Sequence, residues 1–144
     1  MKNKVQQEFL FQQVGHCARL VHAAVRPHYQ KGMQPFDLKP SEFAVLSLLA
    51  ENTSLPQKNL SEALKISQPN MAALVDRLEQ RSLVVRGMAE DDRRVTTVAL
   101  TDPGQALYLA SQAAVQQLED EAVAMLTAEE KNQLLQLLAK VVRG

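Results

Sequence analysis

Apolar residues recur at helical spacing along most of the chain. One such stripe runs from Val5 to about His28, and Pro27 is expected to end or kink that helix. A second helix is predicted to begin at Pro40 and to fade at Glu51–Asn52. It is apolar nearly all round, which indicates a buried helix.

The middle of the chain predicts a short helix, a tight turn and another helix. The short helix begins near Pro56, and the three-residue link Lys65-Ile66-Ser67 follows it. Ser67 is an N-cap candidate for a helix from Gln68 to about Arg81, which has Pro69 in its first turn. This order is typical of a helix-turn-helix.

The period then changes to short β-branched runs. Leu83–Arg86 and Val95–Leu100 predict two strands, and the charged segment 89–94 between them predicts the tip of a hairpin. A charged hairpin directly after a helix-turn-helix is typical of a wing, because the narrow minor groove of DNA, about 6 Å wide, admits an arginine on a loop tip.

Two helices are predicted after the hairpin. Thr101 is an N-cap candidate for a long helix that reaches about Leu126, and Thr127 with Glu130 forms a capping-box pattern for a last helix. The apolar stripes of these two helices are longer than one small domain can bury by itself, which indicates an interface with another molecule. The alternative is that the stripes close on the core of the same chain.

Composition places the chain among globular proteins. It has 144 residues, 46% of them apolar and 22% charged, with 16 basic and 16 acidic side chains, so any basic surface is local. The single cysteine, Cys17, has no internal disulfide partner. No apolar run reaches the length of a membrane span, and the segment Met1–Phe11 is too polar for a signal peptide. We therefore expect a soluble, cytoplasmic protein that makes no contact with membranes.

Several motifs together resemble a known family. Leu83–Arg86, Asp92-Arg93-Arg94 and Leu100-Thr101-Asp102-Pro103-Gly104 are similar to the wing signature of MarR-type transcription regulators, and Leu38–Phe43 resembles the start of that family's second helix. The resemblance covers about residues 8–142. It implies a mainly α (α+β) fold with a winged helix-turn-helix domain at 36–100. Residues 1–35 and 101–144 would form helices of a dimerisation domain.

The resemblance also implies a function. The expected protein is a homodimer that binds double-stranded DNA at a palindromic operator, acts as a repressor and is released by a small-molecule effector. A winged-helix module that binds protein is the weaker alternative, since the wing and the polar helix favour DNA.

The first turn of the helix that starts at Gln68 holds the candidate base readers. Gln68 and Asn70 pair well with adenine, and Met71 suits a thymine methyl group. Ser67 is included in the same DNA-binding set. The alternatives are ordinary exposure and capping for the polar residues, and a place in the core for Met71.

Three arginines are candidate DNA contacts. Arg77 is expected to contact a phosphate, the alternative being an internal ion pair with Asp76 or Glu79. From the resemblance, Arg94 would enter the minor groove and Asp92 would orient it. Arg93 would contact a phosphate. A solvated charged turn is the alternative for this tip.

The first helix carries the candidate effector and redox residues. His16 with Arg19 would bind a carboxylate, in line with the aromatic acids that many family members hold. The alternative is that both are ordinary surface or core residues of this helix. Cys17 is the candidate sensor of a peroxide-switched alternative, against a more ordinary interpretation as a small buried hydrophobe. The spacing of six residues keeps His16, His22 and His28 off one helix face, so we expect no metal site.

Enzymatic activity is not expected. The sequence has no phosphate-binding glycine loop, no nucleophile elbow and no paired carboxylates on an apolar scaffold. Asp91 and Asp92 are adjacent, but at a turn tip, where pKa values are hardly perturbed. No cofactor is predicted.

Overall fold

The computed structural model describes residues 5–144, which divide into two compact units. Residues 32–115 form one, here called the central unit, and residues 5–31 with 116–144 form the other, the terminal unit. Among the described residues, no helix is both long and apolar enough to cross a membrane.

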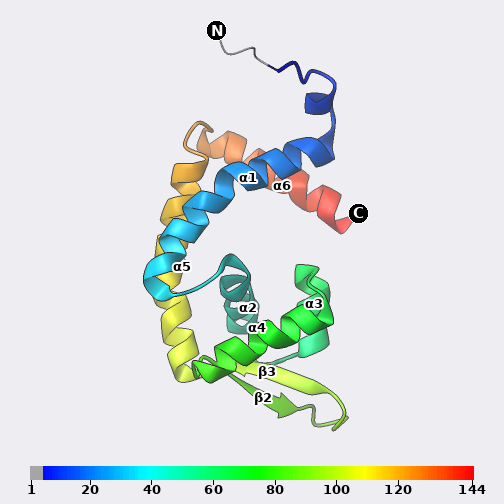
Figure 1. Cartoon of the computed structure of the whole chain (residues 1–144), viewed down its shortest axis with the longest axis vertical. Helices are drawn as coiled ribbons and strands as arrows, with labels where there is room; N and C mark the ends of the chain where they lie inside the picture. The colour runs from blue at the N-terminus through cyan, green and yellow to red at the C-terminus, as the bar shows by residue number, and fades with distance from the viewer. Residues whose placement is uncertain (1–4) are drawn as a thin grey trace. The chain divides into compact units, whose positions relative to one another are not determined.

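The central unit has the predicted order of helices and strands (Figure 1). Near its start lies a short 3₁₀ turn at Gln34–Phe36. The elements are α2 (Pro40–Glu51), β1 (Leu55–Pro56), α3 (Gln57–Leu64), α4 (Gln68–Gln80), β2 (Val84–Met88), β3 (Thr96–Leu100) and the first part of α5 (Asp102–Ala122). The mainly helical fold with a small antiparallel sheet is confirmed.

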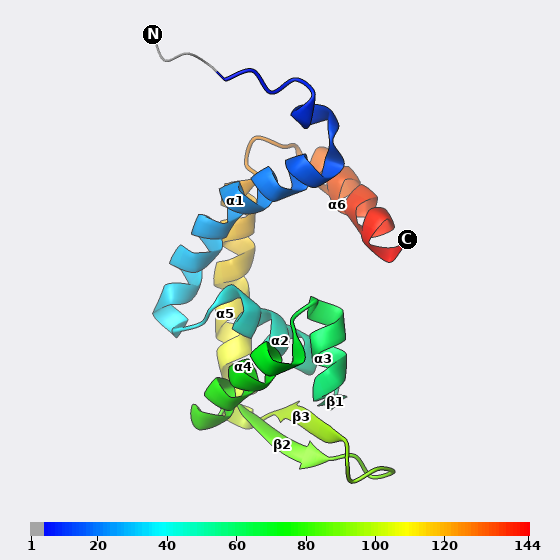
Figure 2. The same cartoon turned by 45° about the vertical axis from the view of Figure 1, so that its right-hand side comes forward.

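The strands form one antiparallel sheet in the order β1-β3-β2. Val84 pairs with Leu100 and Met88 with Thr96, which makes the predicted hairpin (Figure 2). The sequence did not predict β1, where Leu55 pairs with Val98. That strand has only two residues, too few to show an alternating pattern.

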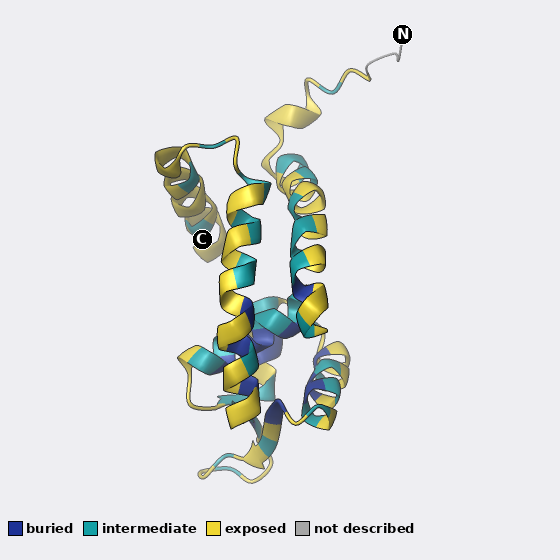
Figure 3. Cartoon of the chain, turned by 90° about the vertical axis from the view of Figure 1, so that its left-hand side faces the viewer, coloured by how far each residue is buried: buried dark blue, intermediate teal, exposed yellow. Residues whose placement is uncertain are grey.

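The hydrophobic core lies in the central unit, where the buried positions of Figure 3 gather. It draws on α2, α3, α4 and the sheet. The fully buried side chains there include Val45, Leu46, Leu60, Met71, Val75, Leu78 and Val98. Burying side chains of this size contributes about 1.5–3 kcal/mol each, so this core fixes α4 against the sheet.

The predicted caps explain where the helices begin. Ser67 Oγ accepts a hydrogen bond from the Asn70 amide at 3.4 Å, which confirms the start of α4. Lys39 supplies no cap to α2. Instead, Glu42 Oε2 accepts from the Lys39 amide at 2.9 Å and satisfies that donor.

The terminal unit contains most of α1 (Val14–Met33), the end of α5 and α6 (Ala128–Arg143). The Tyr29 hydroxyl donates to Glu119 and joins α1 to α5, and burial together with this carboxylate raises the pKa of Tyr29. Lys131 Nζ lies 2.7 Å from Asp120 and joins α6 to α5. The capping box of Thr127 and Glu130 is confirmed.

Three predicted helix boundaries are wrong. The first helix begins at Val14 rather than Val5, after a short 3₁₀ turn at Leu10–Gln12, and it continues through Pro27 to Met33. A proline removes one helical hydrogen bond. Packing of the last turn outweighs that loss, since Met33 is buried. The long helix after the wing ends at Ala122, short of Leu126.

Ser82 has a left-handed backbone, with φ of 59°. The Leu83 amide donates to the Leu78 carbonyl and the Ser82 amide to Glu79, a C-terminal cap in which glycine is usual. We expect Ser82→Gly to stabilise the protein by about 0.5–1 kcal/mol, because glycine removes the left-handed strain. Urea unfolding measures this, and Ser82→Ala, which keeps the strain, is the matched control. A gain in Ser82→Ala as large as in Ser82→Gly would contradict the explanation.

Candidate nucleic-acid interface

A tight turn connects α3 to α4. Lys65 adopts a left-handed conformation, with φ of 55°, and the Ile66 amide donates to the Ser61 carbonyl at 3.1 Å. This closes α3 and lets α4 start two residues later at Gln68. The arrangement is a helix-turn-helix, with α4 in the place of the recognition helix.

The first turn of α4 presents polar side chains to solvent. Ser67, Gln68 and Asn70 are exposed. Met71 is fully buried, so its predicted contact with DNA is wrong. Its position places it on the same stripe as Val75 and Leu78, which face the core.

The hairpin tip holds the predicted wing residues. Arg94 is 91% exposed, and its guanidinium makes two hydrogen bonds to the Asp92 carboxylate, Nε to Oδ1 at 3.1 Å and Nη2 to Oδ2 at 3.3 Å. The Arg94 amide also donates to Asp92 Oδ1 at 3.0 Å. These hydrogen bonds lower the pKa of Asp92, which favours the charged carboxylate. Arg93 is exposed, and so are Glu90 and Asp91.

Arg86 ties the wing to the recognition helix, a role that sequence reasoning missed. Its guanidinium lies 2.6 Å from Asp76 and 2.8 Å from Glu79, and it donates to the Ala72 carbonyl at 3.1 Å and to Gln57 at 3.2 Å. It therefore joins β2 to both α3 and α4. The one available signal was that Arg86 belongs to the motif that resembles the family.

Arg77 has partners other than those expected. Asp76 and Glu79 pair with Arg86, whereas Arg77 pairs with Glu42 and Asp37 from outside its own helix. Its proposed contact with a phosphate stays a prediction.

The candidate effector and redox residues lie on α1 in the terminal unit. The His16 ring meets Phe11 edge to face, with ring centres 6.0 Å apart, and within residues 5–144 its Nε2 is shielded from solvent with no hydrogen-bond partner. Arg19 is exposed. Cys17 donates to the Phe11 carbonyl at 3.4 Å.

Cys17 also lines an apolar cavity of about 380 Å³ between α1 and α6. The residues that line it within the described chain include Val14, Val21, Leu134 and Leu138, which make the wall mainly apolar, and also His22. A reactive thiolate is usually stabilised by a lysine, an arginine or a protonated histidine, and His22 is the one residue of these types in the lining. The mainly apolar wall favours the interpretation of Cys17 as a small apolar side chain.

A helix-turn-helix followed by an arginine-tipped hairpin defines the class of winged-helix DNA-binding proteins. Part of the chain matches a known family of transcription regulators. The family model described as "MarR family" matches residues 36–95, which span α2 to the wing tip.

Known relatives agree with this assignment. The chain is 29% identical over 123 residues to the HTH-type transcriptional regulator MhqR of Bacillus subtilis, with 83% of each chain covered. Its structure is similar to that of the transcriptional repressor CouR bound to a 23-mer DNA duplex, with a TM-score of 0.88, 29% identity and 97% and 99% of the two chains covered.

A third relative is ligand-regulated. The structure of BpsR from Bordetella bronchiseptica, whose DNA binding is regulated by 6-hydroxynicotinic acid, has a TM-score of 0.84 at 25% identity, with 92% of this chain and 94% of that chain covered. The protein described here is thus a winged-helix transcription regulator, and the proteins to which it is similar include a repressor bound to DNA and a ligand-responsive regulator.

Proposed function

We propose that this protein is a homodimeric repressor that binds a palindromic operator and is released by a small ligand of the aromatic-acid class. The observation that carries the proposal is the exposed Arg94 guanidinium, held by Asp92 at the tip of a wing that follows a helix-turn-helix. The proposal implies that the protein lies in the cytoplasm, because operator DNA is accessible there.

For DNA, the proposal assigns three kinds of contact. Gln68 and Asn70 read base edges in the major groove, with Ser67 at the same helix end. Arg94 enters the adjacent minor groove, and Arg93 binds a phosphate. The exposure of all five side chains supports these assignments. The proposal therefore assigns DNA binding to residues 36–100.

For the dimer, the support is the apolar surface of the terminal helices. Large apolar side chains of α1 and α6 are exposed to solvent. In α1 they are Val14 and Val21, and in α6 they are Leu134, Leu135, Leu138, Val141 and Val142. Exposed apolar faces of this kind mark interfaces, so residues 1–35 and 101–144 are proposed to pair with a second copy. Two copies would present two recognition helices to a palindrome.

For the ligand, the proposal uses His16 and Arg19 on α1. Both groups suit a carboxylate, and they lie three residues apart on the same helix. Ligand binding would release DNA if the ligand favours a dimer whose helix spacing does not fit the operator; a coupling of about 1–3 kcal/mol suffices.

Selection of bound duplexes from random DNA tests the proposal. We expect a palindrome with half-site centres about 10–10.5 bp apart, bound by a species with twice the mass of one chain in sedimentation. Addition of 6-hydroxynicotinate or benzoate then tests release, with His16→Ala as the control that should respond less. Selection of no sequence, or binding by a single chain, would contradict the proposal.

A further inference from the structure

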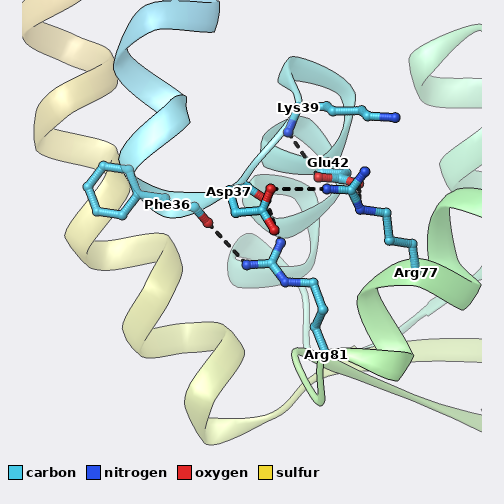
Figure 4. Close-up of polar contacts among 6 residues, drawn as sticks. All are labelled: Phe36, Asp37, Lys39, Glu42, Arg77 and Arg81. Atoms are coloured by element: carbon cyan, nitrogen blue, oxygen red, sulfur yellow. Dashed lines mark hydrogen bonds and ion pairs between the residues drawn. The ribbon is translucent and has the colours of Figure 1, made fainter.

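The guanidinium of Arg77 forms ion pairs with carboxylates of the central unit (Figure 4). Arg77 Nε lies 3.0 Å from Glu42 Oε1, and Arg77 Nη2 lies 3.4 Å from Asp37 Oδ1. The Glu42 side chain is only 2% exposed, whereas that of Asp37 is 79% exposed. Arg77 therefore reaches from α4 to a buried carboxylate at the start of α2.

Glu42 depends on this contact. Its carboxylate accepts a hydrogen bond from the Lys39 amide, and among residues 5–144 Arg77 is the cation within 4.0 Å of it. A buried carboxylate without a cation or hydrogen bonds is strongly unfavourable. If Arg77 turned outward to a phosphate, it would leave Glu42 without its cation.

Arg81, four residues further on and directly after the end of α4, strengthens the same connection. Its Nη1 donates to the Asp37 carbonyl at 2.6 Å and its Nη2 to the Phe36 carbonyl at 3.1 Å. Arg77, Arg81, Asp37 and Glu42 thus join the second half of α4 to the loop before α2 (Figure 4). We call these four residues the arginine brace.

The brace lies on the face of α4 that carries a proposed base reader. A groove of about 460 Å³ between α2 and α4 is lined by Ser41, Asn70, Ala73 and Arg77 among others. Asn70, Ala73 and Arg77 follow one helix face, so a change at Arg77 alters how the exposed start of α4 is held.

We propose that Arg77 is a positioning residue, whose ion pair with buried Glu42 sets the recognition helix on α2, and that it makes no phosphate contact. The proposal rests on the proposed DNA binding. It differs from the sequence prediction in one measurable quantity: the salt dependence of binding, in which each phosphate contact contributes about 0.9 units of log–log slope.

Arg77→Met, Glu42→Gln and the double variant test this. The probes are the duplex that the wild-type protein selects and a scrambled duplex of equal length. We expect Arg77→Met to lower the melting temperature by roughly 10 °C, because Glu42 loses its cation. At temperatures where circular dichroism shows it folded, it should lose about tenfold in preference for the selected duplex.

The double variant separates the two roles. The amide side chain that Glu42→Gln introduces still offers an oxygen to the Lys39 amide, and the buried charge is gone. We expect the double variant to regain most of the melting temperature and of the duplex preference, with the wild-type salt slope. If it fails to fold, Glu42→Gln with Arg77→Gln replaces it. Arg93→Met is the matched control: its slope should fall while its melting temperature stays unchanged.

Two results would overturn the proposal. A folded double variant whose slope falls by about 0.9 or more would show that Arg77 binds a phosphate. A folded Arg77→Met protein with wild-type duplex preference would show that the ion pair serves stability alone. If the wild-type protein selects no duplex, DNA binding itself fails, and the melting temperatures of the four proteins still show whether Glu42 and Arg77 are coupled.

Discussion

Replacing Gly104 with alanine is expected to destabilise the central unit by about 3 kcal/mol or more. A Cβ at this position would lie 1.9 Å from the Leu83 carbonyl oxygen and 3.2 Å from Leu100 Cδ2. The nearer atom belongs to the backbone, so a side-chain rotation cannot relieve the clash. That carbonyl also accepts from the Thr101 amide, and Thr101 Oγ1 donates to the Ser82 carbonyl at 2.6 Å. The start of α5 is thus held against the junction of α4 and β2.

Thermal unfolding followed by circular dichroism measures the effect, which corresponds to a fall of roughly 10 °C in melting temperature. Gly15→Ala is the matched control, since a Cβ there meets nothing within 4 Å. In α1, alanine is expected to leave stability unchanged or to raise it by up to about 1 kcal/mol. Equal melting curves for Gly104→Ala and wild type would show that the Leu83 carbonyl can move away from the new Cβ without a loss of stability.

Local signals explain which elements the sequence predicted. Ser67 and Pro69 mark the start of α4, and Thr127 with Glu130 marks that of α6, because caps depend on residues a few positions apart. The motif that ends at Gly104 indicated the family, but the reason for glycine there is a contact with Leu83, which only the fold reveals.

The functional surface was harder to predict where it depends on distant partners. Met71 stands in the first turn of α4, yet the core takes its side chain. Arg77 has two acidic neighbours in its own helix, yet the carboxylates with which it pairs belong to Asp37 in the loop before α2 and to Glu42 in α2. Periodicity gives the face on which a side chain lies but not the partner that the fold brings to it.

Arg94→Ala is expected to weaken binding to the selected operator by about 1–3 kcal/mol, or roughly 5- to 150-fold. The wing tip is exposed, so the variant should keep the wild-type melting temperature. The loss should depend on sequence, because narrow A·T-rich minor grooves attract arginine most strongly. Fluorescence anisotropy with duplexes that carry A·T or G·C pairs beneath the wing measures it. The wild type should prefer the A·T duplex, and Arg94→Ala should not.

The role of Asp92 follows from a double-mutant cycle with Arg94. Asp92 carries a negative charge, which the DNA phosphates repel. It also holds the Arg94 guanidinium through two hydrogen bonds, and this can favour binding by orienting the arginine. If it orients Arg94, Asp92→Ala should weaken operator binding in the wild type and leave it unchanged in Arg94→Ala. If Asp92 mainly repels DNA, its removal should strengthen binding in both backgrounds. Arg94→Lys separates charge from geometry, since a lysine ammonium cannot make the paired contact with Asp92 and should restore little of the A·T preference.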